Sequence, residues 1–289
     1  MLPFKKVLVP VDYSEAGDAI VPYVKDTLNH FSGELTLVHA YGPEALGYID
    51  LPVTNPDIAD ETAANQAEKL REFAQKTYPG RHVECFTQLG EAGTVIEHAV
   101  DLYGADVVMM PTHGRGPMRR MLLGSVAAKI LHDVSAAVWT GVGKSIDDPQ
   151  THKPHVPYKS VLCAVDGSEE TSAVIVAGHA IAKAYDAKLT VLHVVDVPRS
   201  DYEVDYESFF RDLKEASETQ MRELMSSLNI DAAHIIGEGN VADSVHRAAA
   251  KVKADLVVAG RGHSQGTFSR MWSHLYTVVR ESPCPVLSI

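Results

Sequence analysis

The sequence is poor in cysteine and has no long apolar run. Its three cysteines, Cys85, Cys163 and Cys284, are an odd number without CxxC spacing. This argues against a disulfide framework or a zinc knuckle and favours a reducing cytoplasm. No run reaches the roughly 18 consecutive apolar residues of a membrane span, and the N-terminus lacks the apolar core and cleavage site of a signal peptide. We therefore expect a cytoplasmic protein with no membrane partner.

Positive charge is also scarce. Lys and Arg number 26 against 38 Asp and Glu, which gives a formal net charge of −12 at pH 7. Duplex DNA and anionic membranes need concentrated positive charge, so we expect no nucleic-acid partner. Hydrophobic residues make up 45% of the 289 residues, enough for a buried core. The length is about twice that of a typical domain of ~150 residues, and it therefore predicts two domains.

The chain contains one pattern twice. Residues 7–15 recur as residues 161–169, and Leu35–His39 recurs as Leu189–His193, both at an offset of 154. Farther on, an Ala-Asp-x-Val motif at residue 105 recurs at an offset of 149. Several landmarks in one order indicate a duplication whose second copy has lost five residues in its middle.

Each copy alternates short β-branched runs with longer helical patterns. The runs predict strands at 5–11, 34–40, 82–88, 106–111 and 136–140, and at 159–165, 188–195, 231–236, 254–260 and 285–288. Helices are predicted at 15–30, 57–78, 93–103 and 122–132, and at 169–185, 203–228, 241–252 and 270–281. This alternation predicts an α/β fold with two tandem, Rossmann-like, doubly wound parallel sheets of five strands.

The two copies are separated by a segment rich in proline. Residues 144–157 hold three prolines and almost no apolar periodicity, which is typical of a linker. We therefore expect a first domain at 1–143, a linker at 144–157 and a second domain at 158–289.

Polar residues recur at the strand ends of both copies. Ser14 and Ser168 follow the first strand, where a hydroxyl can cap the next helix. His39 and His193 recur at the end of the second strand, where we expect hydrogen-bonded structural histidines rather than catalytic bases. Neither copy shows a Gly-x-Ser-x-Gly elbow for a nucleophile, and we predict no catalytic residue and no metal site.

Ligands of doubly wound sheets bind beyond the carboxyl ends of the strands. After the first strand comes Asp12, and after the fourth comes a loop, residues 111–126, with three glycines and the basic residues Arg115, Arg119 and Arg120. Glycines let backbone N–H groups approach a phosphate, and a helix beginning near Ser125 would aim its positive end at an anion. The alternative is that the glycines only form turns and the arginines form a solvated face.

At these residues both copies resemble the universal stress protein family, and the chain resembles its tandem two-domain members. The first-strand Asp and Ser look like the opening signature of the family. Its nucleotide motif is Gly-x2-Gly-x9-Gly-(Ser/Thr), and Gly114 followed after nine residues by Gly124 and Ser125 matches the last three fixed positions. Pro111 stands in place of the first glycine, and proline offers no N–H.

The resemblance implies that the protein binds ATP or a related adenine nucleotide as a ligand, with or without a Mg or Mn ion. It places Asp12 near the adenosine end and Gly114, Gly124 and Ser125 at the phosphates. The implied nucleotide-binding residues of the first copy are Pro10, Asp12, Ala40, Met110, His113, Gly114, Arg115, Gly124, Ser125 and Val126. The second copy departs further, and its implied degenerate site consists of Asp166, Gly260, His263 and Ser273.

Family members pair through the last strand of the domain. The candidates here are residues 136–139 and residues 285–289, so the resemblance implies an internal pseudo-dimer and, beyond it, a possible homodimer. Pairing would also cover two apolar edge strands.

Three functions remain open. The first is a stress-response protein in which an adenine nucleotide bound at the first copy regulates conformation or partner choice. The second is a scaffold for stress-related interactions that has lost nucleotide binding, as the broken motifs suggest. The third is an enzyme with slow ATP hydrolysis or adenylating activity, for which no dedicated base or metal cluster is seen.

Overall fold

The computed structural model describes residues 4–46, 56–114, 123–141, 155–195, 206–261 and 270–289. These residues form two compact units that divide after Gly141. The predicted linker lies largely outside the described residues. Each unit is considered on its own.

The first half is a parallel sheet of five strands with the order β3-β2-β1-β4-β5. A short 3₁₀ turn, Pro43–Leu46, follows the second strand. The strands are β1 (Lys6–Pro10), β2 (Glu34–Tyr41), β3 (Val83–Leu89), β4 (Val107–Met110) and β5 (Ala137–Thr140). The helices are α1 (Glu15–Phe31), α2 (Pro56–Thr77), α3 (Ala92–Tyr103) and α4 (Ser125–Asp133).

The second half repeats this arrangement with the order β10-β9-β6-β7-β8, again with parallel pairing. Its strands are β6 (Ser160–Val165), β7 (Lys188–Val195), β8 (Ala233–Glu238), β9 (Leu256–Ala259) and β10 (Val286–Ser288). Its helices are α5 (Thr171–Tyr185), α6 (Tyr206–Ser227), α7 (Val241–Val252) and α8 (Arg270–Glu281). The predicted α/β fold with two five-stranded parallel sheets is confirmed.

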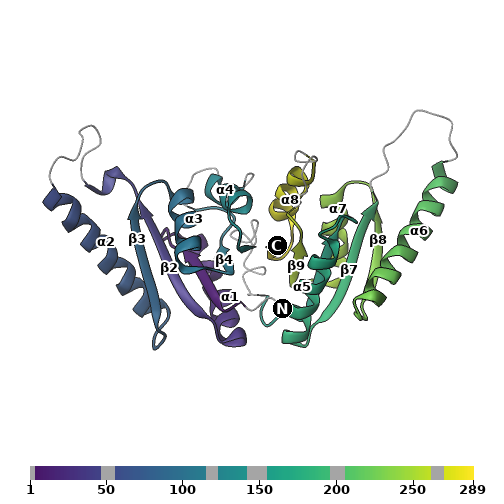
Figure 1. Cartoon of the computed structure of the whole chain (residues 1–289), viewed down its shortest axis with the longest axis horizontal. Helices are drawn as coiled ribbons and strands as arrows, with labels where there is room; N and C mark the ends of the chain where they lie inside the picture. Colours follow the sequence, from purple (N-terminus) through teal and green to yellow (C-terminus); the bar gives the residue numbers. More distant parts are fainter. Residues whose placement is uncertain (1–3, 47–55, 115–122, 142–154, 196–205, 262–269) are drawn as a thin grey trace. The chain divides into compact units, whose positions relative to one another are not determined.

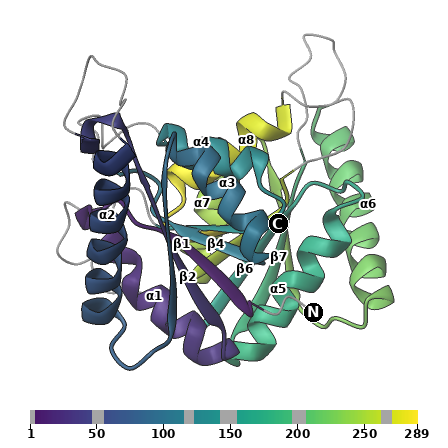
Figure 2. The same cartoon turned by 60° about the vertical axis from the view of Figure 1, so that its left-hand side comes forward.

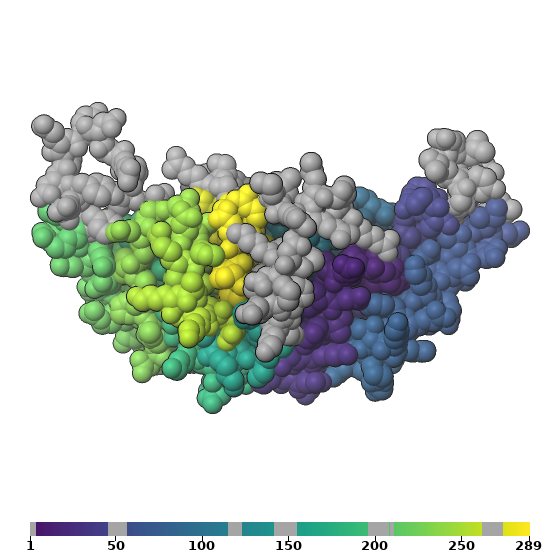
Figure 3. All heavy atoms as spheres, turned by 180° about the vertical axis from the view of Figure 1, so that it is seen from behind, coloured from purple at the N-terminus to yellow at the C-terminus, as the bar shows by residue number. Residues whose placement is uncertain are grey.

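Helices cover both faces of each sheet (Figures 1 and 2). Right-handed crossovers place α1 and α2 on one face of the first sheet and α3 and α4 on the other. In the second half, α7 and α8 lie side by side on the surface, yellow-green and yellow in Figure 3. Because both faces are covered, the central strands β4 and β9 are buried along their whole length.

The register of the sheets confirms both repeat offsets. Val7 pairs with Leu35 and Val161 pairs with Leu189, each at an offset of 154. At the third strands the offset has become 149, because Thr36 lies opposite Glu84 and Thr190 lies opposite Ala233. The five-residue difference therefore falls between the second and third strands, outside the sheet core.

A repeated carboxylate ties the start of the first strand to the fourth in each half. Asp106 accepts the backbone N–H groups of Lys5 and Lys6 at 3.0–3.2 Å. Its counterpart Asp255 accepts those of Lys159 and Ser160 at 2.7 and 3.0 Å. This explains the recurring Ala-Asp motif as a structural feature of the amino-terminal edge, away from the carboxyl ends where ligands bind.

Candidate functional site

The turn after β1 holds the Asp12 carboxylate in place. Its Oδ1 accepts a hydrogen bond from the Ser14 backbone N–H at 3.0 Å and from the Ser14 hydroxyl at 2.6 Å. Ser14 in turn caps α1, because its Oγ accepts from the Gly17 N–H at 3.2 Å. The predicted helix cap at Ser14 is confirmed, and the same residue fixes one oxygen of Asp12.

Tyr13 covers this turn in an unusual backbone conformation. Its φ is 56°, a left-handed backbone angle that residues other than glycine rarely adopt. The equivalent residue of the second half is Gly167, with a φ of 81°. The Tyr13 ring packs against His39 at 4.8 Å and Phe73 at 5.6 Å between centroids, and Lys69 Nζ lies 4.2 Å from its centre. These contacts hold the Tyr13 side chain and help to offset the backbone strain.

Gly114 approaches Asp12 from the loop after β4. A Cβ at position 114 would overlap Oδ2 of Asp12 and lie 3.5 Å from its Cγ. The carboxyl ends of β1 and β4 are neighbours in the sheet, since Leu8 pairs with Val108. Asp12 and Gly114, about a hundred positions apart in the sequence, therefore meet at the carboxyl-terminal edge of the sheet.

Gly124 directly precedes α4 and lies against Thr112 and His113, at the start of the loop after β4. Its N–H donates to the Thr112 carbonyl at 2.8 Å, and a Cβ there would lie 3.2 Å from that oxygen and 3.4 Å from His113 Cα. Gly124 is the N-cap of α4 and supplies no capping side chain. The N-termini of α1 and α3, by contrast, are capped by Ser14 and Glu91. The first turn of α4 thus presents backbone N–H groups and the positive end of the helix dipole beside the loop.

The predicted nucleotide residues of the first half lie at the carboxyl ends of three adjacent strands. Pro10 ends β1, Ala40 is the penultimate residue of β2 and Met110 ends β4. Ser125 and Val126 open α4, with Ser125 exposed, and His113 bonds the Thr112 hydroxyl through Nδ1 at 2.8 Å. Arg115, Arg119 and Arg120 lie outside the described residues.

The repeated histidines are placed as expected. His39 Nδ1 lies 2.7 Å from the Val11 carbonyl, and His193 Nδ1 lies 3.3 Å from the Val165 carbonyl. Each ring therefore joins the end of the second strand to the end of the first. This geometry supports the structural interpretation of both residues.

The predicted helix cap at Ser168 is wrong. Helix α5 begins at Thr171, its N-cap position is Glu170, and no side chain caps it. The Ser168 hydroxyl instead accepts from the Glu170 N–H at 3.3 Å, inside a turn that precedes the helix. The second half thus keeps the Asp166 to Ser168 bond, at 2.9 Å, but starts its helix later than the first half.

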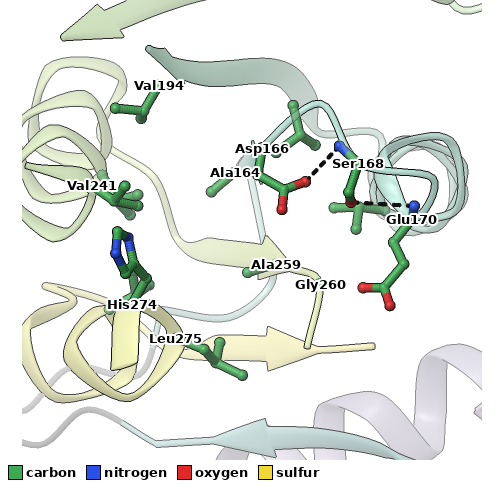
Figure 4. Close-up of a pocket in the computed structure, with 14 residues that line it drawn as sticks. Ala164, Asp166, Ser168, Glu170, Val194, Val241, Ala259, Gly260, His274 and Leu275 are labelled. Carbon is green, nitrogen blue, oxygen red and sulfur yellow. Dashed lines mark hydrogen bonds between the residues drawn. The ribbon is translucent and has the colours of Figure 1, made fainter. Parts of the chain in front are cut away.

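Glu170 changes the surroundings of Gly260 in the second half. A Cβ at Gly260 would lie 3.1 Å from Glu170 Oε2, so the carboxylate lies directly over this glycine (Figure 4). The next residue, Arg261, is only 5% exposed. Burial lowers the pKa of Arg261 to about 10, and the Glu170 carboxylate acts in the opposite direction. The equivalent residues of the first half are Ala16 and Thr112, which carry no charge.

A pocket lies at this place in the second half. It is lined by strand-end residues of β6 and β9 and by side chains of α5, α7 and α8, among them Asp166, Gly260 and His274. Of the predicted degenerate site, Asp166 and Gly260 thus come together, Ser273 lies in the first turn of α8, and His263 lies outside the described residues. The apolar lining lies outside the motif positions, so the motif alone did not predict it.

The described residues contain neither a candidate membrane span nor a cluster of potential metal ligands. None of their helices is long and apolar enough to cross a membrane. Within the same ranges, no three His, Cys, Asp or Glu side chains lie together as potential metal ligands.

Comparison with known proteins gives a family match in both halves. The model of the universal stress protein family matches residues 3–140 and 157–289. A universal stress protein of Thermus aquaticus is 32% identical over 136 residues, which are 46% of this chain and 98% of the relative. One from Mycolicibacterium smegmatis is 27% identical over 200 residues, which are 66% of this chain and 64% of the relative.

Solved structures agree on the fold. A universal stress protein from Archaeoglobus fulgidus covers 100% of this chain and 97% of its own, with a TM-score of 0.68 at 21% identity. Another universal stress protein, solved in complex with cAMP, aligns with 46% of this chain at 23% identity and a TM-score of 0.36. The two matched segments, together with the repeated register, lead to one assignment: the chain belongs to the universal stress protein family and carries two of its domains in tandem.

Proposed function

We propose that this protein is a cytoplasmic stress-response protein that binds ATP or a related adenine nucleotide in its first half. The bound nucleotide acts as a regulator by setting the conformation of the protein or its choice of partner. Binding, not turnover, is the proposed activity, and no residue is assigned a catalytic role.

The close approach of Gly114 to Asp12 carries this proposal. A Cβ at Gly114 would overlap the carboxylate, and one at Gly124 would press on the Thr112 carbonyl. Both glycines therefore allow close packing, Gly114 against the turn after β1 and Gly124 against Thr112 beside the start of α4. We call these three segments together the cradle. Such a cradle suits a ligand with a sugar at one end and phosphates at the other. The hydroxyl groups of the sugar would donate hydrogen bonds to the Asp12 carboxylate, and the phosphates would accept them from the N–H groups at the start of α4.

The charges in the first half support the same orientation. The start of α4 lacks a capping side chain, so its N–H groups are available to phosphate oxygens. Asp12, which would repel phosphate, lies at the other end of the cradle beside Ser14. A divalent ion, if one accompanies the nucleotide, would be held mainly through the phosphates, as Mg²⁺ usually is in nucleotide sites.

The test begins with the purified full chain. Denaturing it and analysing the released small molecules asks whether a nucleotide is already bound, and calorimetry with added ATP measures affinity. We expect saturable ATP binding that Gly124→Leu abolishes. The matched control is Gly260→Leu, which changes the equivalent strand edge of the second half and should leave ATP affinity unchanged.

The competing scaffold function makes the opposite prediction. Pro111 lacks the N–H that a glycine at the first motif position would offer. If no nucleotide is released and added ATP produces no heat, the scaffold replaces the regulator. ATP hydrolysis that disappears in Asp12→Ala would instead favour an enzyme.

The pairing of residues 136–139 with residues 285–289, and any homodimer, remain predictions. Sedimentation of the full chain with and without ATP measures the assembly. A monomer in both conditions would contradict the homodimer.

A further inference from the structure

The pocket of the second half is mainly apolar. Its cavity measures about 100 Å³ and lies between helices from both faces of the sheet, at the carboxyl ends of β6 and β9. Val241 and Val245 of α7 and Leu275 and Val278 of α8 line one side, and Val174 of α5 lines the other. For comparison, an apolar cavity of about 150 Å³ is large enough to bind benzene. A single ring is therefore the right order of size for this pocket.

Comparison with the first half shows how this space arises. The offset of 149 places Ala259 at the position of Met110, and both residues end the fourth strand of their half. The Met110 side chain is buried, with 5% of its surface exposed. Replacing a methionine by alanine at this position removes three heavy atoms from the strand end. The shortened side chain leaves room at the floor of the second-half pocket.

Other substitutions make the walls apolar. Val278 stands where the first half has Lys129, which forms ion pairs with Glu97 at 3.4 Å and with Asp133. Val241 takes the place of Ala92, the first residue of α3. The second half has thus replaced a charged and a small side chain by valines, and apolar surface that faces an open cavity favours an apolar ligand.

The polar groups of the pocket select against anions. Figure 4 shows the Asp166 and Glu170 carboxylates on one side and His274 across from them, beside Val241. The Asp166 carboxylate accepts from the Ser168 N–H through Oδ1, and the side chain is exposed at the mouth of the pocket. Helix α8 presents His274 where α4 presents Ser125. The Asp166 carboxylate can accept a hydrogen bond from a donor and repels phosphate, whereas the charge of Glu170 is opposed by the neighbouring Arg261, which does not line the pocket. The Ser168 hydroxyl and the His274 imidazole can donate as well as accept.

We propose that the second-half pocket binds a small, largely apolar molecule that carries a hydrogen-bond donor and no negative charge. The ring of this molecule lies among the valines of α5, α7 and α8, and its donor bonds the Asp166 carboxylate. The site is independent of the nucleotide proposed for the first half, so either can fail without the other.

Three matched probes test the chemistry on the full chain. Phenol has one ring and a donor and is neutral at pH 7, anisole has the same ring without the donor, and benzoate carries a negative charge. Saturation-transfer NMR measures weak binding of each. We expect saturable binding of phenol, at least threefold weaker binding of anisole and no binding of benzoate.

The variant Ala259→Met places the first-half residue at the floor of the pocket. It should weaken phenol binding at least tenfold. Ala250→Met adds the same side chain to the exposed side of α7 and should leave binding unchanged. If Ala259→Met fails to fold, Asp166→Ala gives a second test, because it should remove the preference for phenol over anisole.

Competition with ATP separates this site from the nucleotide site. Saturating ATP should leave phenol binding unchanged, and phenol binding should persist in Gly124→Leu. The proposal is overturned if phenol does not bind saturably, if benzoate binds as well as phenol, if ATP displaces phenol, or if Ala259→Met binds phenol as the unaltered chain does.

Discussion

The carboxylate of Asp12 occupies the space in which a side chain at position 114 would begin. Asp12 follows β1 and Gly114 follows β4, and these two strands are neighbours in the sheet. The Oδ1 atom is held by Ser14, so the carboxylate is not free to turn away without losing two hydrogen bonds. Position 114 therefore needs a glycine because any larger side chain would collide with the Asp12 carboxylate, and this is a structural reason for the glycine of the motif.

Gly114→Ala should weaken ATP binding at least tenfold. The new Cβ would push the Asp12 carboxylate or the loop after β4, and either movement separates the two ends of the cradle. Calorimetric titration of the full chain measures this. The control is Gly260→Ala, whose Cβ would instead meet Glu170 in the second half and should leave ATP affinity within twofold. Unchanged affinity in Gly114→Ala would show that the cradle does not bind the nucleotide.

Glu91 should stabilise the protein in a pH-dependent manner. Its carboxylate caps α3 by accepting the N–H groups of Gly93 and Thr94 at 3.0 and 2.9 Å. These hydrogen bonds lower the pKa of Glu91 below its ordinary value of 4.5. A depressed pKa means that the stabilisation is complete above the unfolded pKa and is lost as the pH falls through the folded pKa.

We therefore expect Glu91→Ala to lower the free energy of unfolding by about 1 kcal/mol at pH 7, the usual size of a lost cap at a partly exposed site. Urea unfolding at pH 7 and at pH 3 measures the difference, which should shrink at the lower pH. Glu72→Ala, an exposed position on α2, serves as the control. An equal cost for Glu91→Ala at both pH values would contradict the assigned role of the carboxylate.

The three thiols should differ sharply in reactivity. Burial raises the pKa of Cys163 to about 12 and that of Cys284 to about 12, while Cys85 is half-buried and its pKa is raised by the same cause. At pH 8 a thiol of pKa about 12 is ionised to only about 1 part in 10⁴, against roughly a quarter for a free cysteine. Cys163 and Cys284 are therefore expected to be inert in the folded chain.

A colorimetric disulfide reagent at pH 8 checks this expectation. One thiol, Cys85, should react in the native protein, and all three should react in denaturant. The Cys85→Ser variant should lose the native reaction and keep two reactive thiols in denaturant. Fast native reaction in Cys85→Ser would mean that a buried thiol is accessible.

Much of the fold could be predicted because the sequence contains the same pattern twice, so the strands expected in one half could be checked against those expected in the other. The offsets of 154 and 149 carried each strand of one half onto the other, and the sheet register follows both. That Asp12 and the start of the loop after β4 lie at one edge of the sheet was also predictable, because parallel strands bring their carboxyl ends to one edge. The contact between Gly114 and the carboxylate was not predictable, because it depends on the path of the backbone after β4 and not on residue type.

Other features depended on packing that no motif reports. The later start of α5 follows from the turn at Ser168 and Glu170, although both halves share the Asp and Ser of the signature. The second-half pocket depends on Ala259, a residue that looks like ordinary strand core in the sequence. The repeat offset aligns Ala259 with Met110, but only the structure shows that Ala259 lines the pocket.

Gly178→Ala should destabilise the second half through a single contact. A Cβ at Gly178, in the middle of α5, would overlap the sulfur of Cys163 on β6. Overpacking of this kind usually costs about 1–3 kcal/mol, which equals or exceeds the ~1 kcal/mol that alanine gains over glycine in a helix. The overlap should be relieved by shortening its partner, so Cys163→Ala combined with Gly178→Ala should be more stable than Gly178→Ala alone. Urea unfolding of the single and double variants measures this coupling.

Cys284→Ala combined with Gly178→Ala is the control and should show no relief, because the Cys284 thiol is not among the atoms nearest to position 178. If the two double variants unfold with the same free energy, the Cys163 contact is not the reason for glycine at this position.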